Sequence, residues 1–120
     1  MKQISIVVPC YNEVEALPLY YEAMLPVLDQ LRAQGAEADF VFVDDGSTDG
    51  TLRVMRELHE KDTRCGYLSF SRNFGKEAAM FAGLQHARGT RMSHTVATSQ
   101  MAANFASPPL RIVPTTWNAL

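Results

Sequence analysis

From Ala78 to Leu120 the chain contains no acidic residue. All thirteen Asp and Glu residues lie between Glu13 and Glu77, and the later stretch carries only three arginines as full charges. Because Mg²⁺ and Mn²⁺ prefer carboxylate oxygens, we expect no metal site in that stretch. The net charge of −2 over 120 residues gives no indication of nucleic-acid binding.

Cysteines are few, and long apolar runs are missing. Cys10 and Cys65 have neither CxxC nor CxxH spacing, so we expect buried strand thiols and no disulfide framework. No segment approaches the ~20 apolar residues of a membrane helix, and the N-terminus has no signal-peptide core. These features predict a cytoplasmic chain without a transmembrane segment.

Apolar patterning up to residue 89 alternates between strand and helix. Strands are predicted over 4–9, 40–43 and 66–70, and helices over 14–31, from a cap at 47–49 to about 61, and over 77–86. Pro26 is expected to kink or divide the first helix. The order predicts an α/β fold with a parallel sheet and flanking helices, arranged in three layers. Ligands of such sheets bind at the carboxyl ends of the strands.

The pattern stops after Gly89. Residues 90–120 show no sustained period, so we predict two parts: an ordered domain over 1–89 and a poorly ordered tail over 90–120. A helical turn at 100–105 and a short strand at 110–113 stay open as local alternatives.

Three loops follow the predicted strands. In the first, Tyr11 offers a flat face for a base, and Asn12 can cap the next helix. In the second, Asp44 and Asp45 are adjacent carboxylates, which can accept hydrogen bonds from a base or a ribose but do not attract a pyrophosphate. Each loop alone also fits an ordinary strand-to-helix turn.

The third loop has the opposite charge. Arg72 and Lys76 can neutralise phosphate, the first through its planar fork and the second as a point charge. Taken together, the three loops indicate a nucleotide site with an acidic nucleoside end and a basic phosphate end.

Three segments carry a family resemblance: ISIVVPCYNE (4–13), FVDDGSTDGTL (42–52) and SFSRNFGKEAAMFAGLQHARG (69–89). They resemble successive signature segments of family 2 glycosyltransferases with the GT-A fold. The third is most similar to the branch that transfers a sugar to a polyprenyl phosphate, such as dolichol-phosphate mannose synthases and bactoprenol glucosyltransferases.

The resemblance implies roles for nine residues. It implies that Asp44 reads the base and that Asp45 and Ser47 shape the nucleotide pocket. Arg72 and Lys76 are implied to line the donor site near the phosphates. The remaining implied pocket residues are Pro9, Tyr11, Asn12 and Glu13. The implied partners are a UDP- or GDP-linked sugar and a polyprenyl phosphate, with the enzyme at the cytoplasmic face of the membrane.

The family's next strand ends in an Asp-x-Asp motif that holds Mg²⁺ or Mn²⁺, and neither this motif nor a later catalytic acid occurs here. We therefore expect a truncated chain without metal ligands or catalytic residues, and residues 90–120 are expected to arise from a frameshift or from mis-splicing. The alternatives are a non-catalytic fragment that binds nucleotide weakly and a family 2 transferase for a polysaccharide or another acceptor.

Overall fold

A computed structural model describes residues 2–90 and 95–98 of the chain. Strands and helices alternate from the N-terminus, as the sequence predicts. Their bounds are β1 Lys2–Cys10, α1 Ala16–Ala33, β2 Ala36–Asp44, α2 Thr51–Lys61, β3 Cys65–Ser69, α3 Lys76–Thr90 and β4 Thr95–Thr98. The predicted α/β fold class is confirmed.

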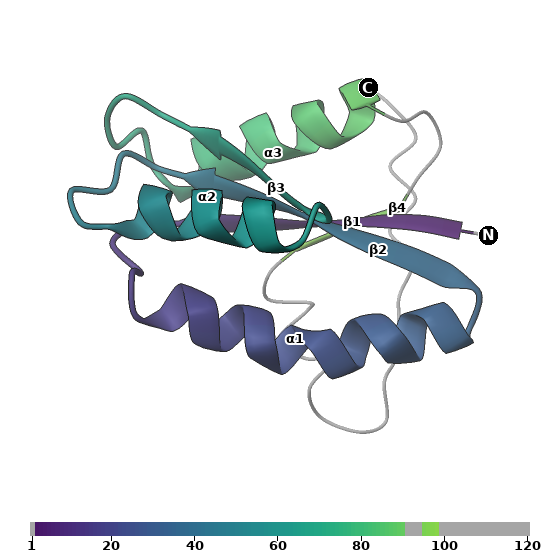
Figure 1. The fold of residues 1–120 in the computed structure, drawn as a ribbon. Helices are drawn as coiled ribbons and strands as arrows, with labels where there is room; N and C mark the ends of the chain where they lie inside the picture. Colours follow the sequence, from purple (N-terminus) through teal and green to yellow (C-terminus); the bar gives the residue numbers. More distant parts are fainter. Residues whose placement is uncertain (1, 91–94, 99–120) are drawn as a thin grey trace.

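All strand pairs in the sheet are parallel, and the strand order is β3-β2-β1-β4. β1 and β2 pair along their whole length, from Lys2 beside Ala36 to Cys10 beside Asp44. Figure 1 shows α1 and α2 on one face of the sheet and α3 on the other, which gives the predicted three layers. Because the strands are parallel, their carboxyl ends and the loops that follow them lie at one edge.

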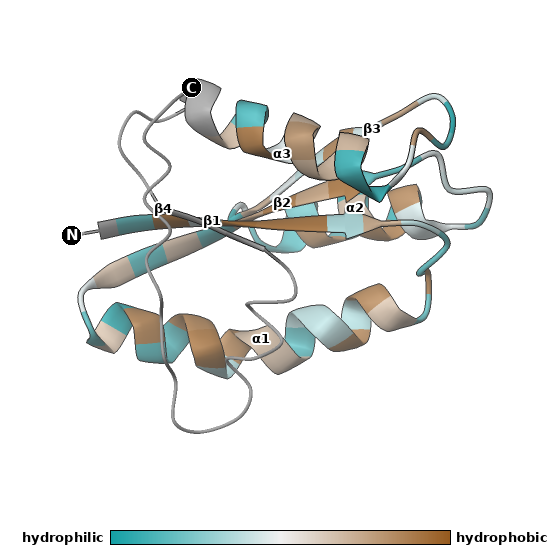
Figure 2. Cartoon of the chain, turned by 180° about the vertical axis from the view of Figure 1, so that it is seen from behind, coloured by the Kyte–Doolittle hydropathy of each residue, from teal (hydrophilic) through white to brown (hydrophobic). Residues whose placement is uncertain are grey.

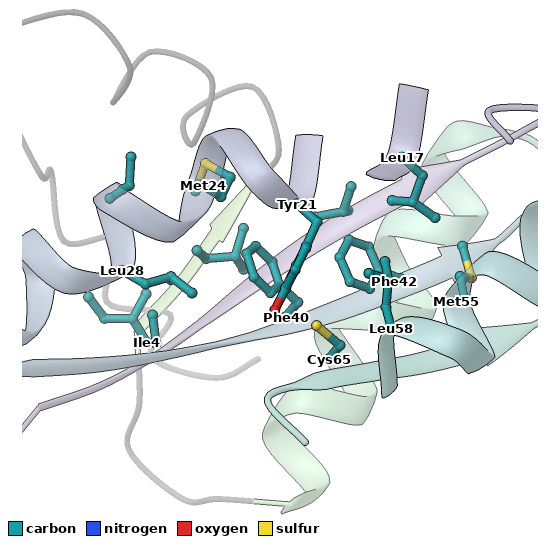
Figure 3. Packing of buried hydrophobic residues seen from close by; sticks show 14 of the residues in the cluster. Ile4, Leu17, Tyr21, Met24, Leu28, Phe40, Phe42, Met55, Leu58 and Cys65 are labelled. Carbon is teal, nitrogen blue, oxygen red and sulfur yellow. The ribbon is translucent and has the colours of Figure 1, made fainter. Parts of the chain in front are cut away.

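The larger core lies between the sheet and the helix pair α1 and α2. Phe40 and Phe42 of β2 are at most 1% exposed, and their rings stack with centroids 5.1 Å apart. α1 packs a stripe of side chains against them, labelled in Figure 3: Leu17, Tyr21, Met24 and Leu28. Figure 2 shows hydrophobic bands, coloured brown, alternating with hydrophilic ones along α1. Cys10 and Cys65 are buried and free, as predicted, and burial raises the pKa of the Cys65 thiol to about 12.

The smaller core lies between the sheet and α3. Val7, Val41 and Val43 face Ala79 and Ala87 of the helix. Gly83 lies at the closest approach, because a Cβ atom there would stand 2.4 Å from Val7 Cγ1 and 3.1 Å from Val43 Cγ2. Valine is stiff at χ1 and cannot easily move away. The missing side chain at this position therefore lets α3 sit directly on β1 and β2.

Two helices differ from their predicted form. α1 is a single element from Ala16 to Ala33 with Pro26 inside it, so the prediction of a division there is wrong. Burial on both sides of Pro26, by Met24 and Val27, holds the two halves on the same strands. α3 runs through Gly89 to Thr90, four residues beyond the predicted end at His86. Within the described residues, no helix combines the length and apolarity that crossing a membrane requires.

A fourth strand follows α3, at a place where no regular period predicts one. Thr95–Thr98 pair with Ile4–Val7 of β1 in parallel register. Four residues are too few for a sequence period to be recognised, and backbone pairing with a buried strand places them in the sheet. The candidate elements at 100–105 and 110–113 lie outside the described residues.

Gly83→Ala should destabilise the fold. Helix propensity alone favours alanine by about 1 kcal/mol, but the added methyl group clashes with Val7, and overpacking of this kind costs about 1–3 kcal/mol. We expect a net loss of free energy of unfolding, measured by urea denaturation. Gln85→Ala, on the exposed side of the same helix, serves as the control and should change it by less than about 0.5 kcal/mol. A Gly83→Ala protein as stable as the wild type would contradict the close packing.

Candidate functional site

The loops after β1, β2 and β3 meet at the carboxyl edge of the sheet, on the left in Figure 1. The loop after β2 lies between the other two because β2 is flanked by β1 and β3. Its backbone is bonded on both sides: Asp45 N donates to Cys10 O over 2.9 Å, and Phe70 N donates to Asp44 O over 2.8 Å. The middle loop is therefore the structural link between its neighbours.

Asn12 joins the first loop to the second. Its backbone N donates to Ser47 Oγ over 2.9 Å, and its Oδ1 accepts from Thr48 N over 2.8 Å. Its φ of 52° lies in the left-handed region, which asparagine tolerates better than most residues. The prediction that Asn12 caps α1 is wrong, because its side-chain oxygen is used across the loops, and the N-cap of α1 is Glu15, which makes no side-chain capping bond.

Asp49 and Thr51 continue this connection at the start of α2. Asp49 accepts from Thr51 N over 2.9 Å and from the Thr51 hydroxyl, and these bonds lower the pKa of its carboxyl. The same carboxylate accepts from Val14 N over 3.3 Å, and Glu13 N donates to Thr51 Oγ1 over 2.9 Å. The formal N-cap is Gly50, not a residue of the predicted cap at 47–49.

Asp44 is 2% exposed, and protein groups bond both of its oxygens. Oδ1 accepts from Ser47 N over 3.0 Å, which closes the turn of the second loop. Oδ2 accepts from Ser69 Oγ over 3.3 Å, at the end of β3. The Asp44 carboxylate thus fixes the middle loop against the neighbouring strand.

Asp45 is 3% exposed and holds the third loop. Its Oδ1 accepts from Phe74 N over 2.8 Å, and its Oδ2 accepts from Gly75 N over 3.1 Å. Two backbone N–H donors on one carboxylate compensate its burial. The start of α3, with Lys76 as its first residue, is positioned by this contact.

Gly46 allows the second and third loops to touch through their backbones. A Cβ atom at this position would lie 2.2 Å from the carbonyl carbon of Arg72 and 2.4 Å from Asn73 N. Its φ of 70° is also unfavourable for other residues. Only glycine satisfies both conditions, so Gly46 brings the loop that carries Arg72 against the paired aspartates.

A pocket of about 450 Å³ opens beside the end of β1. Its volume falls in the range of small-molecule sites. Tyr11, which is 46% exposed, lines the pocket. The charged lining residues are Glu13 from the first loop, Asp45 from the second, and Lys76 at the start of α3. The rest of the wall is mainly apolar and comes from β1 and the first turns of α1: Val8, Pro9, Cys10, Ala16, Leu17 and Tyr20.

The nine predicted residues divide into two groups. Five line the pocket, namely Pro9, Tyr11, Glu13, Asp45 and Lys76. The other four lie in the surrounding framework: Asn12, Asp44 and Ser47 in the hydrogen bonds between loops, and Arg72 with its guanidinium 4.6 Å above the Phe74 ring.

The sequence did not single out the α1 wall. Leu17 and Tyr20 belong to the helical stripe that predicts a core face, and Leu17 is indeed buried. The signal that could have identified them is position, because the first turns of the helix after β1 must lie next to the carboxyl end of that strand. Such residues can be core and pocket wall at once.

Electrostatics at the pocket favour neutral and hydrogen-bonding groups near Glu13. Burial and the nearby Asp49 carboxylate raise the pKa of Glu13. Burial, followed by the charges of Glu13 and Asp44, raises the pKa of Cys10, so its thiol stays protonated. A neutral thiol and an apolar wall suit a flat organic group better than a free phosphate.

The family's metal does not fit the residues described. Within 2–90 and 95–98, no group of three or more His, Cys, Asp or Glu side chains could hold a metal ion. Asp44 and Asp45 already accept hydrogen bonds at all four oxygens. These aspartates serve the loops and are not arranged as cation ligands.

A second cavity, of about 250 Å³, lies at the opposite end of the strands. Arg32, Arg64, Glu37 and Asp39 are among its lining residues, and Arg64 bonds Asp62 over 2.8 Å. The lining thus carries charges of both signs, and it includes no residue of the three loops.

Asp45→Asn should loosen the third loop. An amide offers one acceptor oxygen and turns an NH₂ group toward a backbone N–H, so one buried donor loses its partner at a cost of about 1–3 kcal/mol. We expect a lower free energy of unfolding and shifted NMR signals at Phe74 and Gly75. Asp29→Asn, exposed on α1, is the control and should change stability by less than about 0.5 kcal/mol. Equal stability of the two variants would contradict the role of Asp45.

Comparison with known proteins places these loops in a family. The model of glycosyl transferase family 2 matches residues 5–98, which include all four strands in whole or in part. A prophage bactoprenol glucosyl transferase homolog of Escherichia coli K12 is 45% identical over 87 residues, and a putative glycosyltransferase of Bacillus subtilis is 41% identical over 91 residues. The alignments cover 72% and 74% of this chain but only 28% and 27% of those proteins.

Solved structures agree on the fold. A mannosyltransferase from Pyrobaculum calidifontis, solved with GDP-Man and Mn²⁺, superimposes with a TM-score of 0.53 and 29% identity over 69% of this chain and 24% of its own. TarS of Staphylococcus aureus has a TM-score of 0.61 at 24% identity, over 82% of this chain and 27% of its own.

The family match extends past residue 89 and includes β4. The division of the chain at that residue, with a tail of different origin, stays a prediction. The order of the strands, the linked loops at their carboxyl ends and the match over most of the chain agree with one another. The chain belongs to glycosyl transferase family 2.

Proposed function

We propose that residues 2–90 form the nucleotide-binding part of a glycosyltransferase that uses a nucleotide diphosphate sugar as donor. The observation that carries this proposal is the single pocket in which Tyr11, Asp45 and Lys76 come together from three different loops. An aromatic ring, a hydrogen-bond acceptor and a cation are the groups that a base, a ribose and a phosphate need. Support also comes from the neighbouring mannosyltransferase structure, which contains GDP-Man.

The nucleoside would lie between Tyr11 and the apolar wall. Tyr11 is half exposed and can stack on a base, and stacking on an aromatic side chain contributes about 1–3 kcal/mol per base. Asp45 is the one of the two aspartates that lines the pocket, and each of its oxygens, although bonded to a backbone N–H, keeps a second lone pair that can accept from the nucleoside. The base contact expected of Asp44 stays a prediction, and its oxygens are bonded to Ser47 and Ser69.

The diphosphate would lie toward Lys76. This ammonium group is the cation in the pocket lining, and it can compensate negative charge that develops as the nucleoside diphosphate leaves. Arg72 lies four residues before Lys76 in the third loop. Its guanidinium stacks on the ring of Phe74, which belongs to the same loop. The described residues form no metal site, so the contacts proposed for the diphosphate come from side chains.

The acceptor we propose is a polyprenyl phosphate. Relatives named bactoprenol glucosyl transferases are 45% identical to this chain, which spans just over a quarter of their length. A polysaccharide or another acceptor is the alternative. The residues responsible for the transfer step are not among the nine site residues, whose roles are to bind and to orient the donor at the cytoplasmic side of the membrane.

Calorimetric titration with UDP and with GDP tests the donor site. Tyr11→Ala should weaken nucleotide binding about tenfold or more, because the stacking face is lost. Leu19→Ala removes an apolar side chain that is 71% exposed on α1 and not part of the pocket lining, so it should leave the affinity unchanged.

The same titration separates the two aspartates. If Asp45 contacts the nucleoside, Asp45→Asn weakens UDP or GDP binding by a larger factor than binding of inorganic pyrophosphate, which reports the effect of the loosened third loop on Lys76. If Asp44→Asn has that effect instead, the base contact belongs to Asp44. Wild-type protein that binds neither nucleotide would contradict the proposed function.

A further inference from the structure

An apolar groove of about 400 Å³ runs along α3. Met80, Phe81 and Leu84 line it, all within about one helical turn. Phe81 is 61% exposed, although an aromatic ring of this size normally gains by burial. Met80 and Leu84 also pack against the smaller core, so Phe81 is the apolar lining residue that this core leaves exposed.

Lys76 lies at the junction of the groove and the nucleotide pocket. It belongs to the lining of both cavities, whereas the apolar groove residues belong to the groove alone. A molecule in the groove with a polar end at Lys76 would therefore place that end next to a bound donor. The groove therefore has an apolar part, lined by Met80, Phe81 and Leu84, and a cationic end at Lys76.

Charge favours an anion at that end. The chain has no acidic residue after Glu77, so the length of α3 along which the groove runs carries no negative side chain beyond its first turn. Glu77 also lines the groove next to Lys76, so this end holds one cation and one carboxylate at the N-terminus of α3, where the helix dipole favours negative charge. The groove therefore suits an amphiphile with an anionic head and an apolar chain.

We propose that this groove binds the isoprenoid chain of the acceptor, a polyprenyl phosphate, with its phosphate at Lys76. The inference rests on the proposed function, because it is the donor pocket that makes a phosphate at Lys76 productive. In the transfer, a phosphate oxygen forms the new bond to the anomeric carbon. The bond from that carbon to the nucleoside diphosphate breaks and its electron pair leaves with the diphosphate. No proton has to move if the acceptor phosphate reacts as its dianion.

Farnesyl phosphate is a soluble probe for this groove, and its binding to the full chain can be followed by NMR titration. Phe81→Gln should weaken binding about tenfold or more, because the probe loses its aromatic contact. Phe81 is exposed, so the substitution should leave the fold intact. Leu19→Gln, at another exposed apolar position, on α1, is the matched control and should have no effect.

A second comparison tests the head group. Lys76→Gln should weaken the binding of farnesyl phosphate but not that of farnesol, which lacks the phosphate. Glu77→Gln should leave farnesyl phosphate binding unchanged or strengthen it.

Equal losses in Phe81→Gln and Leu19→Gln would show non-specific adsorption and would overturn the proposal. The same holds if wild-type protein does not bind the probe, as expected if another segment of protein covers the groove. UDP and GDP titrations of the same samples report on the donor site separately. Probe binding without nucleotide binding would contradict the proposed function and leave the groove supported, and the reverse result would contradict the groove alone.

Discussion

Asp44 and Asp45 are buried side by side at the end of β2, and four hydrogen bonds compensate their charges. Burying a carboxylate is costly unless donors replace its water. Here the donors are two backbone N–H groups of the third loop, one of the second loop, and the hydroxyl of Ser69. The cost of burying the two carboxylates is thus offset only when the second loop, the third loop and the end of β3 all lie where their donors reach Asp44 and Asp45. The two aspartates therefore fix the arrangement of the loops at the carboxyl ends of the strands.

This constraint explains how short loops form a defined pocket. Each loop is bonded to the middle one, by Asn12 from the first and by Phe74 and Gly75 from the third, and Glu13 of the first loop bonds Thr51 at the start of α2. Gly46 permits the closest backbone contact. Tyr11 and Lys76, which lie far apart in the sequence, thereby line the same pocket. The stability of the site comes from the framework residues, and its chemistry comes from the residues that line the pocket.

The sequence predicts much of the fold because its strands are buried β-branched runs and its helices show a clear apolar stripe. It also predicts which loops meet. It could not tell which aspartate faces the pocket, because successive side chains at a strand end point to opposite sides. The role of Asn12 depends on a left-handed backbone conformation that only the assembled loops impose. β4 was missed because four residues carry no period, and its place is set by the exposed edge of β1.

The family match and the pocket converge on the same edge of the sheet. The apolar wall from α1 was predicted as core, and Tyr20 and Leu17 show that the two roles overlap where a helix begins beside a strand end. The groove on α3 starts at the same lysine that ends the nucleotide pocket. One cation thus connects the part of the molecule that recognises a nucleotide with a surface suited to an apolar chain.

Hydrogen exchange followed by NMR tests the central claim most directly, namely that the paired aspartates hold the loops in place before any ligand binds. The amides of Glu13, Phe74 and Gly75 donate to groups of the middle loop and of the first residue of α2. We predict that these amides exchange about a hundredfold or more slowly than in an unstructured peptide. Exchange at the rate of an unstructured peptide, while the amide of Val41 in β2 stays protected, would contradict the account.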